Sequence, residues 1–320
     1  MLQERILIAL IFLTLPLMAV AESPVPFRGD RGTLNDFKPQ AAEWLTDDLI
    51  LVSDSHLNNM QIFDTSGRRY RLFDAATNDG PAHFVGLDRL SEKEFLILGS
   101  HYHEKNNSRY RQTRSRLHKF YLDLETEDLR LDDFKHNISP QEPLRMTRMW
   151  GSTPLRQLEF SGLAVNQAKD IAWFGLVQPK SEKGTLSLLR CSLKGLLAQD
   201  KDLEFVEVDT GFEVPLEERC QRPLYLTDLE VVDDGSLLLL FTADDVEGKR
   251  FCTSSLYRWV PGGKATLVKK DLAPNNRATG MAVKSLGGGN YRIALVCDNV
   301  TSRTDQPPRL VILNQPVKVH

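Results

Sequence analysis

A strand–turn–strand unit recurs along this sequence, and its repetition constrains the fold more than any other feature. The clearest copy lies within Tyr225–Asp245, where the short apolar strand Thr227–Val232 leads into the turn signal Asp233-Asp234-Gly235. The apolar run Ser236–Phe241 follows directly. Asp and Gly accept the backbone angles of tight turns, and a short apolar run between turn signals is typical of a strand buried on both faces.

Four further copies of this unit share one anchor position in their first strand. The anchor residues, in chain order, are Gln40, Gly86, Gly162, Asp228 and Gly280. Self-similarity over such long intervals predicts a propeller or a solenoid. Small residues at one repeat position allow the innermost strands of a propeller to approach closely around a central axis.

Two additional candidate strands follow the unit in the first four copies, which gives the four strands of a propeller blade. These outer strands are Met60–Phe63 and Tyr70–Phe73, Arg116–Leu122 and Leu129–Phe134, Thr185–Cys191 and Leu203–Val208, and Ser255–Trp259 and Ala265–Lys269. The last copy has Leu310–Leu313 as a third strand, and a segment around Pro24–Arg28 is expected to supply the fourth and so close the ring. We predict an all-β propeller of five four-stranded blades, with a degenerate sixth blade between the second and third copies as the alternative.

The first 21 residues have the pattern of a signal peptide. Arg5 precedes the apolar run Ile6–Val20, and Ala19-Val20-Ala21 fits the small-x-small cleavage rule. We therefore expect residues 22–320 to form a single propeller domain, periplasmic or secreted, with no membrane span after cleavage. The net charge is −3 and no basic stripe occurs, which argues against a nucleic-acid partner.

The chain has four cysteines, an even number that permits disulfides in an exported protein. Cys220 and Cys252 fall in connections on the same rim of one predicted blade, so a disulfide between them is expected. Cys191 and Cys297 fall on predicted strands, where a cysteine is typically a small buried apolar residue.

Polar residues follow the second strand in nearly every copy. Asp54, His101 and Asp298 occupy one aligned position, and Asp244 follows the corresponding strand of the fourth copy. Equivalent strand ends lie on one face of a propeller, so these side chains are expected at the mouth of the central channel. Such a set suits a divalent cation, Ca²⁺ or Mg²⁺. Alternatively, each acid bonds its own turn.

Three runs also resemble a known family. Phe160–Val165, Leu226–Thr242 and Thr279–Asp298 resemble an uncharacterised bacterial propeller-like family, domain of unknown function 3616, and are distantly similar to the phytase-like esterase propellers. The resemblance implies an exported β-propeller of unknown activity, and it supplies no catalytic residue. Ser161 and Thr279 stand where glutamate is expected before glycine in such strands.

Two classes of function remain open on the sequence. A binding module would use the loop-rich face to hold a protein, a glycan or a small molecule, and the long polar stretches His101–Ser115 and Pro140–Gln157 would belong to that face. A divalent-metal-dependent hydrolase of phosphoesters or lactones at the channel mouth is the alternative. The chain contains no known nucleophile or metalloprotease motif, so the sequence favours the binding module.

Overall fold

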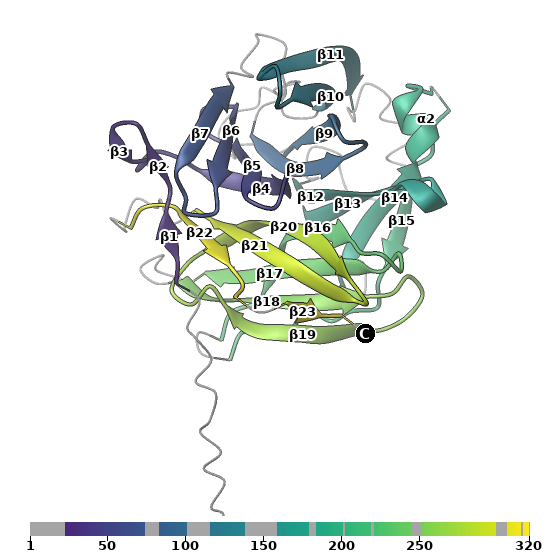
Figure 1. The fold of residues 1–320 in the computed structure, drawn as a ribbon. Helices are drawn as coiled ribbons and strands as arrows, with labels where there is room; N and C mark the ends of the chain where they lie inside the picture. Colours follow the sequence, from purple (N-terminus) through teal and green to yellow (C-terminus); the bar gives the residue numbers. More distant parts are fainter. Residues whose placement is uncertain are drawn as a thin grey trace, which may run out of the picture.

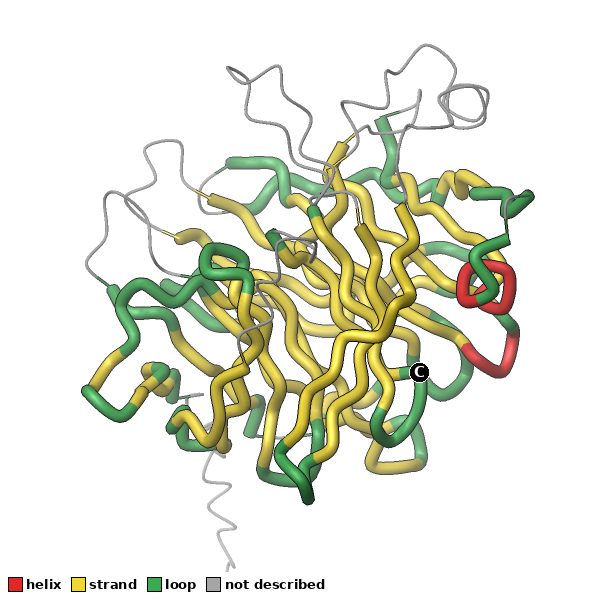
Figure 2. The backbone as a smooth tube through the Cα atoms, turned by 90° about the horizontal axis from the view of Figure 1, so that it is seen from above, coloured by secondary structure: helices red, strands yellow, loops and turns green. Residues whose placement is uncertain are grey.

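The protein is a five-bladed β-propeller, as the sequence predicted. A computed structural model describes residues 23–73, 83–100, 116–137, 159–178, 184–200, 202–218, 221–244, 251–298, 306–314 and 316–319. Figure 1 shows the blades arranged around a centre at which their innermost strands gather. Strand dominates the described residues, and Figure 2 shows the short helix α2 (Leu193–Leu197) at the edge of the molecule.

Each blade is an antiparallel sheet numbered here in chain order from the innermost strand outward. Blade 1 comprises β4 (Pro39–Trp44), β5 (Leu49–Asp54), β6 (Asn59–Asp64) and β7 (Arg69–Phe73). Blade 2 comprises β8 (Phe84–Arg89), β9 (Glu94–Gly99), β10 (Arg116–Asp123) and β11 (Asp128–Asn137). Blade 3 comprises β12 (Glu159–Asn166), β13 (Ile171–Gln178), β14 (Ser187–Ser192) and β15 (Val206–Asp209). Blade 4 comprises β16 (Tyr225–Val231), β17 (Leu237–Asp244), β18 (Phe251–Trp259) and β19 (Ala265–Leu272).

Blade 5 joins the two ends of the described chain. It contains β20 (Ala278–Gly287), β21 (Asn290–Cys297) and β22 (Arg309–Ile312), and its outer strand is β1 (Val25–Pro26). Val25 pairs with Leu310 and Pro26 with Arg309, so the predicted closure of the ring by the N-terminal segment is confirmed. Closure covers an edge that would otherwise be exposed.

Small elements that the repeat pattern does not predict complete the described structure. They are the hairpin β2 (Arg28–Gly29) and β3 (Gly32–Thr33), the 3₁₀ turn η3 (Gln167–Lys169), the helix α2 and the strand β23 (Val317–Lys318), which pairs with β21. Within the described part of the chain, no helix has the length and apolar character needed to cross a membrane.

The hydrophobic core is divided among the seams between blades. Five clusters of buried apolar side chains lie one at each seam, between blades 1 and 2, 2 and 3, 3 and 4, 4 and 5, and 5 and 1. The second strand of each blade therefore contacts apolar neighbours on both faces, and Leu237–Phe241 is fully buried. This explains why these strands are almost wholly apolar in the sequence.

The innermost strands carry two features that set the geometry of the channel. Each has a bulge near its start, where its register with the second strand shifts. Just after the bulge, Gly86, Gly162 and Gly280 contact the next blade so closely that a side chain would not fit. A Cβ atom at Gly86 would lie 2.6 Å from the Leu163 nitrogen. The predicted reason for small anchor residues is therefore confirmed at these positions.

Candidate functional site: a carboxylate triad in the central channel

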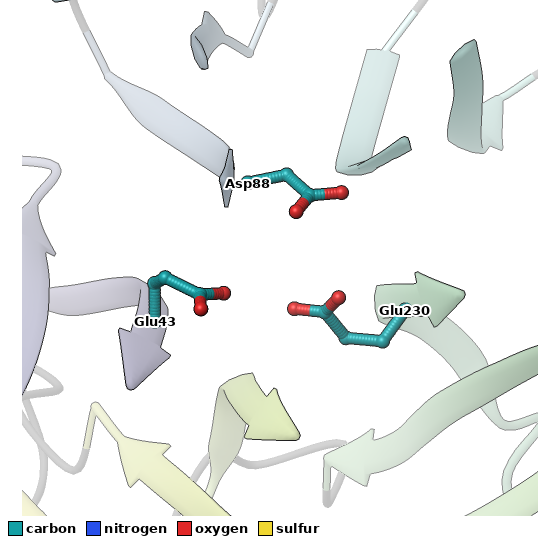
Figure 3. Close-up of side chains that lie close together, drawn as sticks. All are labelled: Glu43, Asp88 and Glu230. Carbon is teal, nitrogen blue, oxygen red and sulfur yellow. The ribbon is translucent and has the colours of Figure 1, made fainter. Parts of the chain in front are cut away.

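Three carboxylates converge between the innermost strands of blades 1, 2 and 4. Glu43 lies on β4, Asp88 on β8 and Glu230 on β16, and ligand atoms from the three side chains lie within 4.8 Å of one another. Figure 3 shows the three carboxyl groups pointing toward a common centre. We call Glu43, Asp88 and Glu230 the channel triad.

The register of the blades explains this convergence. The triad residues pair with Leu51, Leu96 and Leu238 of the second strands. The equivalent positions of blades 3 and 5 hold Ala164 and Ala282. All five positions lie on one level of the ring, so three of them bring carboxylates together and two bring only methyl groups.

The triad is deeply buried but unevenly supported. The relative exposure is 9% for Glu43, 8% for Asp88 and 6% for Glu230. Asp88 accepts hydrogen bonds from the backbone N–H groups of Arg89 and of Val165 in blade 3. Glu43 forms an ion pair with Arg89, whose Nε lies 3.5 Å from Oε1. Glu230 has no hydrogen bond or ion pair with any described residue.

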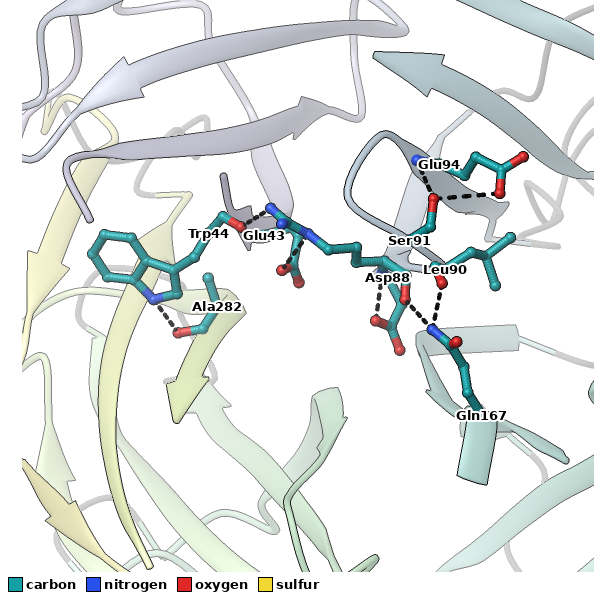
Figure 4. A network of polar contacts seen from close by, with 9 residues as sticks. Glu43, Trp44, Asp88, Leu90, Ser91, Glu94, Gln167 and Ala282 are labelled. Atoms are coloured by element: carbon teal, nitrogen blue, oxygen red, sulfur yellow. Dashed lines mark hydrogen bonds and ion pairs between the residues drawn. The ribbon is translucent and has the colours of Figure 1, made fainter. Parts of the chain in front are cut away.

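Arg89 and its neighbours link the triad to a wider polar network, part of which Figure 4 shows. Arg89 also donates to the Trp44 carbonyl, and the Trp44 indole donates to the carbonyl of Ala282 over 3.0 Å. Gln167 of blade 3 donates to the Leu90 carbonyl of blade 2. These bonds hold the surrounding backbone in place, which limits how far the triad residues can move apart.

Burial disfavours the charged forms of the triad. Burial and the Asp88 charge raise the pKa of Glu43 to about 8, against the opposing effect of Arg89. Burial raises the pKa of Asp88 to about 7, although two backbone hydrogen bonds and Arg89 oppose it. Burial and the charges of Asp88, Glu43 and Asp228 raise the pKa of Glu230 well above its ordinary value. Three like charges in one buried site repel each other unless protons or a cation neutralise them.

A fourth buried acid of the inner ring, Asp228, has a different environment. One oxygen accepts from the Leu229 N–H over 2.9 Å, and the other accepts from the Met281 N–H of blade 5 over 2.8 Å. Its pKa is raised by burial despite these bonds. Both oxygens therefore accept a backbone hydrogen bond, one within blade 4 and one from blade 5, and Asp228 is not part of the channel triad.

Of the residues that the sequence suggested, those that the structure describes lie at the rim from which the inner strands begin. Asp54 ends β5 opposite Pro39, and it accepts hydrogen bonds from His56 at 2.8 Å and Leu57 at 3.1 Å in its own loop. Asp298 follows β21 and pairs with Arg277, with 3.7 Å between Nη1 and Oδ2. Asp244 ends β17, and His101 lies outside the described residues.

The strand registers also separate Asp54 from Asp298 by one position. Counted from the level of the triad, Asp54 is equivalent to Cys297, which pairs with the first residue of β20. Side chains of consecutive strand residues point to opposite faces. The shared position that the sequence alignment suggested is therefore not reproduced for this pair.

The buried thiols agree with the sequence analysis in part. Cys191 on β14 and Cys297 on β21 are buried and free, as expected. Burial raises the pKa of Cys191 to about 12 and also raises that of Cys297. Cys220 and the side chain of Cys252 lie outside the described residues, so the predicted disulfide between them stays a prediction.

Sequence reasoning missed the channel triad, although a signal for it exists. Asp88 and Glu230 each stand two residues after an anchor, Gly86 and Asp228. In the first copy, alignment on Gln40 places Ala42 at that position. The strand pairing puts Ala41 at the anchor level, and this shift of one residue brings Glu43 into line with the other two acids.

Comparison with known proteins supports the fold. An endo-arabinase from Bacteroides thetaiotaomicron VPI-5482 matches with a TM-score of 0.51 at 11% identity, over 93% of this chain and 99% of that one. A luciferin-regenerating enzyme matches with a TM-score of 0.41 at 8% identity, over 93% and 99% of the two chains. The N-terminal domain of Nup159 matches at 0.35 and 9% identity over 83% of this chain, which spans 62% of that domain.

The fold and the endo-arabinase match define the class of protein as a β-propeller. No family model matches the sequence, and no curated protein matches it. The endo-arabinase is 11% identical to this chain, so the likeness shows the fold alone. Any statement about activity therefore depends on the chemistry of the channel triad.

Proposed function

We propose that this protein is a cation-binding β-propeller in which Glu43, Asp88 and Glu230 hold one divalent cation. The observation that carries the proposal is Glu230, a carboxylate that is 6% exposed, is aimed at two other carboxylates and has no partner among the described residues. A buried unpaired charge is costly, and a cation among three carboxylates removes both the desolvation penalty and the mutual repulsion.

Ca²⁺ suits the triad better than Mg²⁺. Both ions prefer oxygen ligands, but Mg²⁺ demands near-ideal octahedral geometry and usually keeps several waters. The triad side chains are at most 9% exposed and come from three separate strands, which leaves little space for a hydrated ion. Ca²⁺ accepts irregular geometry and carboxylates that bind through one or two oxygens.

The burial of the triad favours a cation that organises the ring over one that catalyses hydrolysis. A metal-dependent hydrolase needs an open coordination position for water and access for a substrate. We therefore favour a binding module whose cation joins blades 1, 2 and 4 and whose loop-rich face binds a protein, a glycan or a small molecule. A panel of phosphoester and lactone substrates tests this choice, and turnover that a chelator abolishes would reverse it.

Titration calorimetry on the full mature chain tests the cation site. We expect one Ca²⁺ per chain, weaker binding of Mg²⁺, and a rise in melting temperature on addition of Ca²⁺. Glu230→Gln should remove most of the affinity, because it removes a ligand charge while keeping the side-chain size. Glu94→Gln is the matched control, since Glu94 lies on β9 and pairs with Lys119. Absence of binding, or equal loss in the control, would refute the proposal.

The rim residues offer a second place for the ion, and the same assay separates the two. If Asp54, His101, Asp244 and Asp298 held the cation, Asp54→Asn would weaken binding and Glu230→Gln would not. We expect the opposite result, because Asp54 Oδ1 already accepts two hydrogen bonds from its own loop. Its Oδ2 is buried without a hydrogen bond, but among the described residues no two other metal-binding side chains gather around it. Loss of binding in Asp54→Asn alone would move the site to the rim.

We also propose that the protein is exported and belongs with the uncharacterised bacterial propeller-like family that its inner strands resemble. The support is the signal pattern of residues 1–21 together with the resemblance of Phe160–Val165, Leu226–Thr242 and Thr279–Asp298. Mass spectrometry of the mature protein should find Glu22 as the first residue. A chain that retains Met1 in a cell-envelope or culture fraction would contradict cleavage.

A further inference from the structure

Among the described residues, Arg89 is the basic residue whose side chain contacts the channel triad. It follows Asp88 at the end of β8 and reaches from blade 2 to blade 1. Its Nε lies 3.5 Å from Glu43 Oε1, and one terminal nitrogen donates to the Trp44 carbonyl. Its guanidinium carbon lies over the Phe95 ring, 5.2 Å from the ring centre, which is a cation–π contact.

The positive charge of Arg89 is unevenly distributed over the triad. Arg89 acts on Glu43 and Asp88, whereas Glu230 has no basic neighbour among the described residues. Guanidinium groups stay charged at all ordinary pH values. The charge of Arg89 therefore always balances part of the negative charge of Glu43 and Asp88. The charge of Glu230 is balanced only when a cation is added.

We propose that Arg89 is a built-in counter-ion, which shares the Glu43 carboxylate with the bound cation and limits the charge of the cation that the channel accepts. This inference rests on the cation site proposed above. Arg89 balances part of the triad when no cation is bound, and it repels the cation when one enters. Arg89 thus lowers the affinity for the cation, and it also reduces the repulsion among the triad carboxylates when no cation is bound.

Coulomb's law gives this proposal a quantitative signature. The repulsion between Arg89 and the cation is proportional to the charge of the cation. Removing the guanidinium charge should therefore change the logarithm of the affinity one and a half times as much for a trivalent ion as for a divalent one. A gain of about tenfold for Ca²⁺ corresponds to a gain of about thirtyfold for Tb³⁺.

A purely structural role for Arg89 leads to a different result. Arg89 ties blade 2 to blade 1 through the Trp44 carbonyl, and its loss would loosen the seam beside Glu43. A loosened triad would bind both ions more weakly and by similar factors. The direction of the change in affinity, and its dependence on the charge of the ion, therefore distinguish a counter-ion from a residue that only holds blades 1 and 2 together.

The experiment measures Ca²⁺ and Tb³⁺ affinities of the full mature chain in four variants and the wild type. Arg89→Gln can still donate to the Trp44 carbonyl, and Arg89→Met keeps an apolar stem against Phe95, so the two neutral variants preserve different contacts. Arg89→Lys keeps the charge. Arg258→Gln is the control, because Arg258 on β18 pairs with Asp234 in the turn between β16 and β17 and with no triad residue.

We expect both neutral variants to bind Ca²⁺ at least about tenfold and Tb³⁺ at least about thirtyfold more tightly than the wild type. Arg89→Lys should stay within about threefold of the wild type for both ions, and Arg258→Gln should match it. Melting curves establish that each variant is folded, and if one neutral variant fails to fold the other decides. The counter-ion proposal is refuted if the folded neutral variants bind no more tightly than the wild type, or if the affinity changes by the same factor for Ca²⁺ and Tb³⁺. Absence of binding in the wild type instead overturns the cation site itself.

Discussion

Replacing Glu43 by glutamine should remove a pH dependence of stability that the channel triad imposes on the cation-free protein. Burial and the neighbouring Asp88 charge raise the pKa of Glu43 from 4.5 to about 8. Between these values the folded protein keeps a proton that the unfolded chain has lost. The unfolded state then binds fewer protons, so the free energy of unfolding falls as the pH rises through this window.

The size of the effect follows from the pKa difference. One pKa unit corresponds to about 1.36 kcal/mol. A rise from 4.5 to about 8 thus corresponds to on the order of 5 kcal/mol between the two ends of the window, with a slope of about 1.4 kcal/mol per pH unit. Glu43 and Asp88 interact closely, so the measured slope belongs to the pair.

Guanidinium unfolding in the presence of a chelator, at about pH 5, 6 and 7, measures the slope. The pKa of Asp234, lowered to about 2, affects stability only at more acidic pH, and groups outside the triad contribute equally to the wild type and the variant, so their difference reports the triad. The wild type should lose stability with rising pH, Glu43→Gln should lose much less, and Glu94→Gln should follow the wild type. A constant difference between wild type and Glu43→Gln at every pH would refute the reasoning. Saturating Ca²⁺ should flatten or invert the wild-type slope, because the cation binds the ionised carboxylates.

Two further predictions concern the framework around the triad. Gly280→Ala should destabilise the fold by about 1–3 kcal/mol in chemical denaturation, because the new Cβ would meet the Gln40 carbonyl and lie 2.9 Å from the Ala41 Cα; a stability equal to wild type would show that the seam of blades 5 and 1 can open without cost. In alkylation followed by mass spectrometry, Cys191 and Cys297 should react only after denaturation, since both are buried with raised pKa values. Cys220 and Cys252 should additionally require a reductant, and four thiols labelled without a reductant would exclude the expected disulfide.

Most of the fold was predictable because it depends on local signals. Turn residues such as Asp233-Asp234-Gly235 mark where strands end, and apolar runs such as Leu237–Phe241 mark the strands buried between blades. The expected outer strands correspond to observed ones with ends that differ by a few residues. Closure by β1 was predictable from the missing fourth strand of blade 5. The helix α2 and the hairpin β2–β3 interrupt connections and leave no repeat signal.

The channel triad was harder to predict because its members come from separate blades and one of them is displaced in the alignment. All five inner strands have a bulge near their start, but in β4 neither a glycine nor an aspartate marks the anchor, so the sequence alone does not say whether Gln40 or Ala41 takes that position. A slip of one residue exchanges the faces of a strand. With Gln40 at the anchor, Glu43 is expected to point away from the axis, and only two of the three acids share a level in that alignment.

The inner ring contains acids of two kinds, and their hydrogen bonds rather than their burial distinguish them. Asp228 and Glu230 are two residues apart on β16 and are both almost fully buried, at 3% and 6% exposure. The oxygens of Asp228 accept hydrogen bonds from the backbone N–H groups of Leu229 and Met281, and the bond from Met281 joins two blades. Asp88 combines both arrangements, since it accepts from Val165 of the next blade and faces the other triad acids. Glu230 accepts from no described residue, although amide donors satisfy its neighbour on the same strand. A carboxylate in that position lowers stability unless something positive faces it, and the described positions at the same level of the ring hold further acids or alanines. The part of the channel centred on Glu230 is therefore the part at which a cation contributes most.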